Sequence, residues 1–174
     1  MIIEDLSSLE LSSIARGIPI LGRDKGRWLL EKVKVFQPKS ILELGTANGY
    51  SGIILGSTGA TLTTIEKNPA LAGEAKVNFH KHNIVANVII GDGVEEIKKL
   101  SEYFDIIFID FAKHKYIKVL EDCLRLTKPT ALIIADNITM DGCQDFKKAI
   151  SNNPKLRTEF VDIKDGLSCS IRLP

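Results

Sequence analysis

The sequence is poor in the features that mark secreted, zinc-binding and membrane proteins. Its three cysteines, Cys123, Cys143 and Cys169, are odd in number and form no CxxC pair, which argues against a disulfide framework or a zinc site. No apolar run approaches the roughly 20 residues of a membrane span, and the N-terminus MIIEDLSSLELSS has acids where a signal peptide has a basic start. We therefore expect a soluble, cytoplasmic protein with free thiols and no membrane partner.

A strong net charge is also missing. The 23 lysines and arginines balance 22 aspartates and glutamates, which leaves a formal net charge of +1. This balance gives no broad electrostatic field to gather nucleic acid, so a small-molecule partner fits better. Nucleic-acid binding would need a local basic patch, for which Lys113, Lys115 and Lys118 are the candidates.

From residue 40 onward, short apolar runs alternate with amphipathic segments, which is the rhythm of βαβ units. The runs are SILELG, TLTTIE, NVIIGD, FDIIFID and ALIIAD, and helices are expected near residues 23–36, 49–58, 69–82, 93–101, 115–127 and 141–152. Nearly continuous apolar runs are typical of parallel strands that helices cover on both faces. RTEFVDI and SCSIRL flank the turn KDG and predict a C-terminal antiparallel hairpin. The predicted fold is therefore α/β: a Rossmann-like, doubly wound, mostly parallel seven-stranded sheet closed by that hairpin.

The length of 174 residues predicts a single domain over residues 1–174. Within it, residues 1–16 are expected to be either a loose arm or a short lid helix. Tyr116 and His114 are interpreted as surface residues of a helix.

Each of the five predicted strands ends in an acid or a glycine. In open α/β sheets the ligand crevice lies beyond the carboxyl ends of the strands. Gly45, Glu66, Asp92, Asp110 and Asp136 should therefore share one rim of the sheet.

The turn after the first predicted strand has the sequence ILELGTANGYSG. Gly45 and Gly49 lie between a strand and a helix, where small residues let backbone amides approach a nucleotide-like ligand. The NAD fingerprint GxGxxG would need glycine where this chain has Ala47 and Tyr50, which weakens the dinucleotide interpretation.

The next two strand ends carry residues suited to an adenosine. Glu66 lies 21 residues beyond Gly45, where a carboxylate can accept hydrogen bonds from both ribose hydroxyls. In the triplet GDG, Asp92 could meet the adenine amino group and Gly93 would let the ring lie close to the backbone. A simple turn is the alternative interpretation of that triplet.

Oxygen ligands follow two further strands. Asp110 ends FDIIFID, and Asp136 and Asn137 end ALIIADN. Two carboxylates and one amide carbonyl suit a hard cation, with Mg²⁺ expected first and Ca²⁺ or Mn²⁺ as alternatives. Lys113 lies three residues after Asp110.

Several of these motifs occur in one order along the chain: LGRDKGR, LELGTANGYS, TTIEKN, GDG, FIDFAKHKY, ADN and KDGL. In this order, from about Ile18 to the C-terminus, the chain resembles the catechol and caffeoyl-CoA O-methyltransferases (O-methyltransferase family 3). These are class I S-adenosylmethionine-dependent enzymes. The resemblance implies a metal site of Asp110, Asp136 and Asn137, with Lys113 as the catalytic lysine.

The same resemblance implies how S-adenosylmethionine would be held. Its methionine and ribose parts would lie against Glu43, Gly45, Ser51 and Glu66. The adenine would lie among Asp92, Gly93 and Phe111, next to Asp110, and Leu21 would lie near the methionine end.

The function expected is methyl transfer to a hydroxyl of a small, catechol-like or otherwise hydroxylated acceptor. The chain departs from the family at Ala112, where some members have a second acid, and it lacks a long loop after Asn137. The acceptor and the choice between monomer and homodimer therefore stay open. The alternatives are a hydroxylated-nucleoside (tRNA) O-methyltransferase, an NAD-linked oxidoreductase and a non-catalytic module that binds S-adenosylmethionine.

Overall fold

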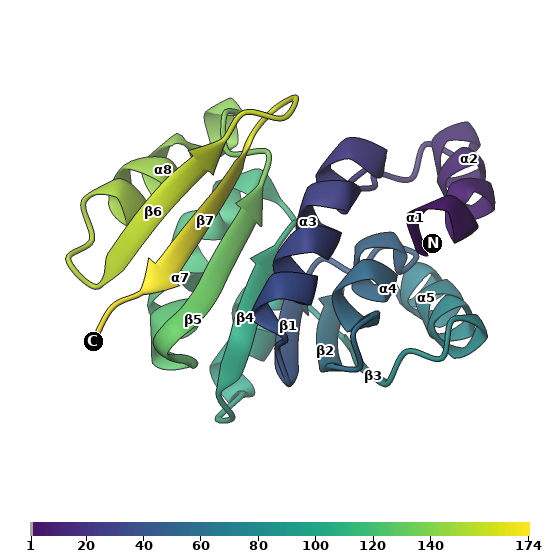
Figure 1. Cartoon of the computed structure of the whole chain (residues 1–174), viewed down its shortest axis with the longest axis horizontal. Coiled ribbons are helices and arrows are strands. Elements are labelled where there is room, and N and C mark those ends of the chain that lie inside the picture. Colours follow the sequence, from purple (N-terminus) through teal and green to yellow (C-terminus); the bar gives the residue numbers. More distant parts are fainter. Residues whose placement is uncertain (1) are drawn as a thin grey trace.

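The computed structural model describes residues 2–174, which form a seven-stranded sheet with helices on both faces (Figure 1). The strands are β1 (Ser40–Leu44), β2 (Thr61–Glu66), β3 (Ala86–Ile90), β4 (Phe104–Ile109), β5 (Thr127–Asp136), β6 (Leu156–Val161) and β7 (Leu167–Arg172). Their order across the sheet is β3-β2-β1-β4-β5-β7-β6. Strands β1 to β5 pair in parallel, whereas β7 is antiparallel to both β5 and β6. The predicted fold class, including the C-terminal hairpin, is confirmed.

Each predicted helix has a counterpart in the structure. The α-helices are α1 (Ile2–Asp5), α2 (Ser7–Ala15), α3 (Arg23–Phe36), α4 (Tyr50–Gly56), α5 (Pro69–Lys81), α6 (Gly93–Glu96), α7 (Tyr116–Arg125) and α8 (Gln144–Ser151). Short 3₁₀ turns are η1 (Ile97–Lys99), η2 (Lys113–Lys115) and η3 (Asp141–Cys143). The helix expected at 93–101 is thus a short α-helix followed by a 3₁₀ turn.

Among residues 2–174, no helix is both long and apolar enough to cross a membrane.

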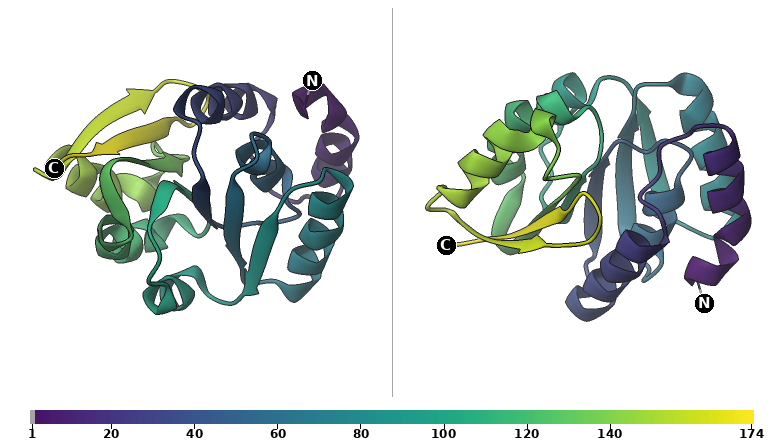
Figure 2. Two further views of the ribbon diagram at one scale, coloured as in Figure 1. Left: turned by 60° about the horizontal axis from the view of Figure 1, so that its bottom comes forward. Right: turned by 90° about the horizontal axis from the view of Figure 1, so that it is seen from above.

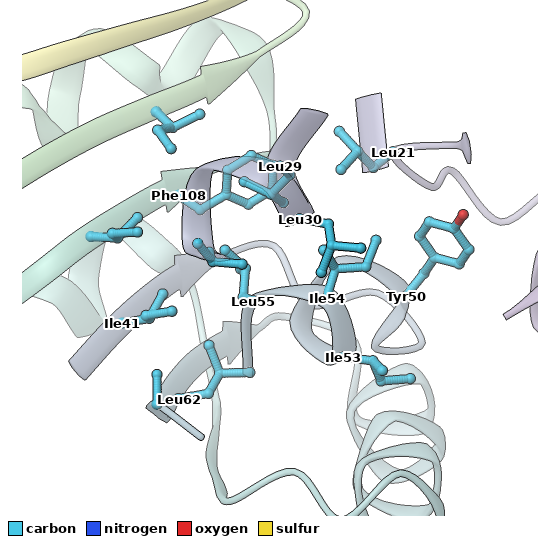
Figure 3. Close-up of a cluster of buried hydrophobic side chains, with 14 of the residues drawn as sticks. Leu21, Leu29, Leu30, Ile41, Tyr50, Ile53, Ile54, Leu55, Leu62 and Phe108 are labelled. Carbon is cyan, nitrogen blue, oxygen red and sulfur yellow. The ribbon is translucent and has the colours of Figure 1, made fainter. Parts of the chain in front are cut away.

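Side chains alternate between the two faces of the sheet, as the period of two in a β-strand requires. Ile41 of β1 and Phe108 of β4 face α3 and α4 (Figure 3). Leu42 and Ile107, their neighbours in sequence, face α7 and α8 on the other side. Two views of the ribbon show these helix layers on either side of the sheet (Figure 2). Both faces are therefore buried, which explains why the strands read as continuous apolar runs.

The described part of the N-terminal segment is helical and is fastened to the rest of the chain. Ile3 of α1 is 2% exposed and packs in the core. Beyond α2, the Arg16 guanidinium forms two hydrogen bonds with Glu74 of α5, at 2.7 and 2.9 Å. Of the two expected forms, this segment adopts the helical one. Its role as a lid stays a prediction.

One surface assignment is wrong. Tyr116, at the start of α7, is fully buried, and its ring stacks on Phe111 and meets Phe146 edge-on, both at 5.6 Å between ring centroids. The reason is helical geometry: Tyr116 lies on the same face of α7 as the buried Val119 and Leu120, which pack against the sheet. His114, in contrast, is exposed as expected.

Candidate active site

The centre of the sheet is its topological switch point. Strands β1 and β4 lie side by side, and the chain proceeds outward from them in opposite directions. The loops after these two strands therefore separate and leave a crevice beyond their carboxyl ends. Gly45 and Asp110 are the first residues after β1 and β4, and two neighbouring cavities open there.

The larger cavity has a volume of about 540 Å³ and lies over the ends of β1, β2, β3 and β4. Most residues predicted to contact a cofactor line it. They are Gly45, Ser51, Glu66, Asp92, Gly93, Asp110 and Phe111, joined by Leu21 from the segment before α3.

Gly45 could not be replaced by a residue with a side chain without moving the neighbouring loop. Its φ of +101° lies in the left-handed region, and a Cβ atom there would come within 2.0 Å of the Asp110 carbonyl oxygen. The turn after β1 therefore lies directly against the end of β4.

The Glu66 carboxylate is held in place by backbone amides. Its Oε2 accepts a hydrogen bond from the Ala47 N–H, and its Oε1 accepts one from the Asn68 N–H, both at 2.8 Å. Each carboxylate oxygen has a second lone pair for a ligand. Glu66 thus joins the turn after β1 to the end of β2 and presents its acid to the larger cavity.

Asp92 lines the larger cavity and caps the N-terminus of α6. Its Oδ1 accepts from the Val94 N–H at 3.0 Å, and its Oδ2 accepts from the Lys115 ammonium at 2.5 Å. The bond to Lys115 lowers the pKa of Asp92. Nearby, the Phe111 ring lies 3.3 Å from where a Cβ on Gly93 would be, so a side chain at residue 93 would press on that ring.

Glu43 lies beneath the turn instead of on the cavity wall. It is fully buried, and its two carboxylate oxygens accept hydrogen bonds from the Ser51 and Thr64 hydroxyls, both at 2.6 Å. Burial raises the pKa of Glu43 to about 8, against the effect of these two hydroxyls. Direct contact between Glu43 and a cofactor stays a prediction, and the geometry gives Glu43 a supporting position under Ser51.

The smaller cavity has a volume of about 480 Å³ and contains the predicted cation ligands. Asp110, Asp136 and Asn137 all line it, together with Lys113. The Lys113 ammonium donates to Asp110 Oδ1 at 2.7 Å. Sequence-distant strand ends are thus brought together as the parallel topology predicts.

Sequence reasoning missed Lys25 and Asp165, which also line this cavity. Lys25 of α3 is only 2% exposed, and its ammonium donates to Asp136 Oδ1 and to Asp165 Oδ1. Burial alone would lower the pKa of Lys25, but its bonds to both carboxylates outweigh burial and raise it. Lys25 and Asp165 lie within the quoted motifs LGRDKGR and KDGL, yet they were treated there as helix and turn residues.

Asp136 has a strongly perturbed carboxylate. Burial and the nearby Asp110 charge raise its pKa, while the hydrogen bond from Lys25 opposes this rise. A buried carboxyl whose pKa is raised in this way, beside a second acid that lines the same cavity, is a common property of functional sites.

The two cavities share part of their walls. Leu21, Asp110 and Lys113 line both. A ligand in the larger cavity and a ligand in the smaller cavity would therefore lie next to each other and contact the same side chains.

One protein-family model matches almost the entire chain. The family model described as O-methyltransferase matches residues 3–173. The chain belongs to the O-methyltransferase family. A catechol O-methyltransferase of Niastella koreensis is 35% identical over 128 residues, which cover 68% of this chain and 58% of that relative. Catechol O-methyltransferase B of Danio rerio is 31% identical over 173 residues, which cover 88% of this chain and 65% of the relative. The chain thus spans less than two thirds of the length of these relatives.

Solved structures share the fold over nearly the whole chain. A Staphylococcus aureus protein provisionally named a caffeoyl-CoA O-methyltransferase has a TM-score of 0.86 at 28% identity and covers 98% of this chain and 91% of its own. An O-methyltransferase from Bacillus cereus in complex with SAH has a TM-score of 0.86 at 24% identity, with 98% and 90% covered. At this lower identity, the second likeness concerns the fold alone.

Proposed function

We propose that this protein transfers a methyl group from S-adenosylmethionine to a hydroxyl oxygen of a small acceptor, with assistance from a divalent cation. The observation that carries the proposal is the pair of cavities that meet at Asp110 and Lys113. One cavity has the polar groups for an adenosyl ligand, and the other has oxygen donors and a lysine for a reacting hydroxyl. Membership of the O-methyltransferase family supports the same assignment.

The residues of the larger cavity fit S-adenosylmethionine. The fixed Glu66 carboxylate can accept hydrogen bonds from two ribose hydroxyls. Gly93 and Phe111 offer a flat, apolar surface for a ring, and Ser51 lies at the start of α4 for the methionine part. The bound cofactor would supply a methyl group on a sulfonium, which is electrophilic enough for direct transfer.

The donor chemistry of the smaller cavity fits a hard cation. Asp110, Asp136 and Asn137 offer only oxygen donors, which Mg²⁺, Ca²⁺ and Mn²⁺ prefer. Burial and the nearby Asp110 charge raise the pKa of Asp136, and a positive charge between the two acids would oppose both effects. Such a cation would orient the acceptor hydroxyl and make its proton more acidic.

Lys113 lies where it can act on the acceptor hydroxyl during the reaction. Its ammonium is held by Asp110 and faces both cavities. It can stabilise the negative charge that develops on the acceptor oxygen, or it can take the proton when it is itself neutral. The C–O bond then forms as the C–S bond breaks, and no covalent link to the protein is needed.

The acceptor class is the part of the proposal that most needs an experiment. Methyl transfer from radiolabelled S-adenosylmethionine should be measured for small catechols and for hydroxylated nucleosides, with added Mg²⁺ or with a chelator. We expect product from a small hydroxylated acceptor and loss of most of that rate under chelation. Transfer only to nucleosides would replace the acceptor class, a rate unchanged by chelation would remove the cation, and no binding of S-adenosylhomocysteine would refute the proposal.

A further inference from the structure

The turn after β5 is joined to the β6–β7 hairpin turn by a hydrogen bond between two side chains. The Asn137 amide Nδ2 donates to Asp165 Oδ2 at 2.5 Å. The backbones of the two turns also pair, since the Thr139 N–H and hydroxyl both donate to the Asp165 carbonyl oxygen, at 3.1 and 2.8 Å. The backbone of Asp165 is therefore held by Thr139, independently of the contact between its side chain and Asn137.

This contact determines which way the Asn137 amide faces. An amide group has one donating and one accepting end, and a carboxylate can only accept. Because the NH₂ end is bonded to Asp165, the Oδ1 atom is left for another partner. Asn137 has a φ of +56°, a left-handed conformation that asparagine tolerates.

Lys25 of α3 bonds to both of these turns. Its buried ammonium joins Asp165 Oδ1 to Asp136 Oδ1, and Asp136 Oδ1 also accepts from the Asn137 backbone N–H at 2.7 Å. Asp136 Oδ2 and Asn137 Oδ1 thus have no hydrogen bond to any residue in the described range 2–174. One oxygen of each residue remains for a ligand in the smaller cavity.

We propose that Asp165 and Lys25 are positioning residues that hold Asn137 and Asp136 with one oxygen each directed to a divalent cation. This inference rests on the proposed cation-assisted function and adds two residues that act on the cation through its ligands. Partners of metal ligands commonly change metal affinity by about 10- to 100-fold when they are replaced.

Two hypotheses about Asp165 predict different results for its replacement by glutamate: one in which only its negative charge matters, and one in which the position of its side chain matters. If its negative charge alone attracts the cation, Asp165→Glu should bind the cation as the wild type does. If its placement against Asn137 matters, the extra methylene should disturb that hydrogen bond and weaken binding by about tenfold or more. The matched control is Asp162→Asn, because the exposed Asp162 lies in the same hairpin turn and its replacement removes one distant charge.

The experiment is a titration of the 174-residue chain and of each variant with Mn²⁺ alone, in which electron paramagnetic resonance follows the free Mn²⁺. Affinity for S-adenosylhomocysteine and the melting temperature, measured in parallel, report whether each variant keeps its fold. We expect Asp165→Glu and Asp165→Asn to weaken Mn²⁺ binding by about tenfold or more, and Asp162→Asn to leave it within about twofold.

A double variant tests the hydrogen bond directly and does not depend on Asp165→Glu folding. Asn137→Asp combined with Asp165→Asn keeps the total charge and reverses the donor and the acceptor of the pair. Its Mn²⁺ affinity should recover to within about threefold of the wild type, since residue 165 would again orient residue 137. Wild-type affinity in Asp165→Glu, or no recovery in the double variant, would overturn the inference alone. No Mn²⁺ binding to the wild-type protein would overturn the cation site as well.

Discussion

The two cavities at the switch point are built in different ways. In the larger cavity, residues close in sequence or on adjacent strand ends meet backbone amides, as Glu66 meets Ala47 and Asn68. In the smaller cavity, side chains from distant segments hold one another: Lys25 bonds to residues 111 and 140 positions away in the chain. The first cavity therefore depends on backbone conformation, and the second depends on a balance of buried charges.

This difference predicts how each cavity fails. A change of backbone geometry should damage the larger cavity first, and a change of charge should damage the smaller one first. The predictions below test this contrast, beginning with the largest expected effect.

Gly45→Ala should disable the larger cavity. Its new Cβ would lie 2.0 Å from the Asp110 carbonyl oxygen, so the loops after β1 and β4 would have to separate. We expect a loss of about 3 kcal/mol or more in the free energy of unfolding and S-adenosylhomocysteine binding weaker by more than about 100-fold. Chemical denaturation and calorimetry would measure these effects.

The matched control for this change is Gly59→Ala. Gly59 also has a positive φ, +90°, but a Cβ there would meet nothing within 4 Å. It should cost only the backbone strain, about 1 to 2 kcal/mol, and leave cofactor affinity unchanged. Equal effects of the two variants on binding would show that the close approach at Gly45 is unimportant.

Lys113→Ala and Asp136→Ala should separate two roles in the smaller cavity. Lys113→Ala should slow methyl transfer by about 100-fold or more and leave Mn²⁺ affinity nearly intact, because an ammonium cannot bind a cation. Raising the pH toward the acceptor's own pKa, near 10 for a phenol, should partly restore its rate. Asp136→Ala should instead lose Mn²⁺ affinity and respond to added metal. Equal loss of metal affinity in both variants would refute this division.

The contrast also explains what could be predicted from the sequence. The succession of strands along the chain and the residues at their ends followed from apolar periodicity, and the rule that parallel strands end on one rim placed those residues together. Glu66, Asp110, Asp136 and Asn137 could therefore be predicted to lie close to one another, and each lines a cavity at that rim. Lys25 and Asp165 were missed because nothing local marks them: a lysine on an amphipathic helix and an aspartate in a hairpin turn are common on surfaces. Only the tertiary structure makes them partners.

Glu43 beneath the larger cavity should make stability depend on pH. Its folded-state pKa of about 8 exceeds the ordinary value of 4.5, so between these values the folded protein holds a proton that the unfolded chain has lost. Stability should therefore fall as pH rises from about 5 to 8 and level off above that range. In Glu43→Gln the side chain stays neutral, so this slope should flatten and the free energy of unfolding at pH 9 should increase by a few kcal/mol, on the order of one per pKa unit of the shift. Parallel pH profiles of the two proteins would exclude Glu43 as the source.

Glu66→Ala should have the smallest of these effects. Its carboxylate bonds to two backbone amides, which water can satisfy in the variant because Glu66 is partly exposed. We expect S-adenosylhomocysteine binding to weaken by about tenfold with little change in melting temperature. Glu66→Gln keeps one acceptor oxygen, so its affinity for S-adenosylhomocysteine should lie between that of the wild type and that of Glu66→Ala. Unchanged affinity in Glu66→Ala would remove this residue from the ribose site.

The most direct test of the two-cavity account is a crystal structure of the protein with S-adenosylhomocysteine and Mn²⁺, using the anomalous signal of manganese. The account predicts adenosyl density between Glu66 and Phe111, and one manganese peak within about 2.5 Å of oxygens from Asp110, Asp136 and Asn137. Lys25 and Asp165 should keep their contacts behind these ligands. A manganese peak at the Lys25 ammonium position, or adenosyl density outside the larger cavity, would contradict the account.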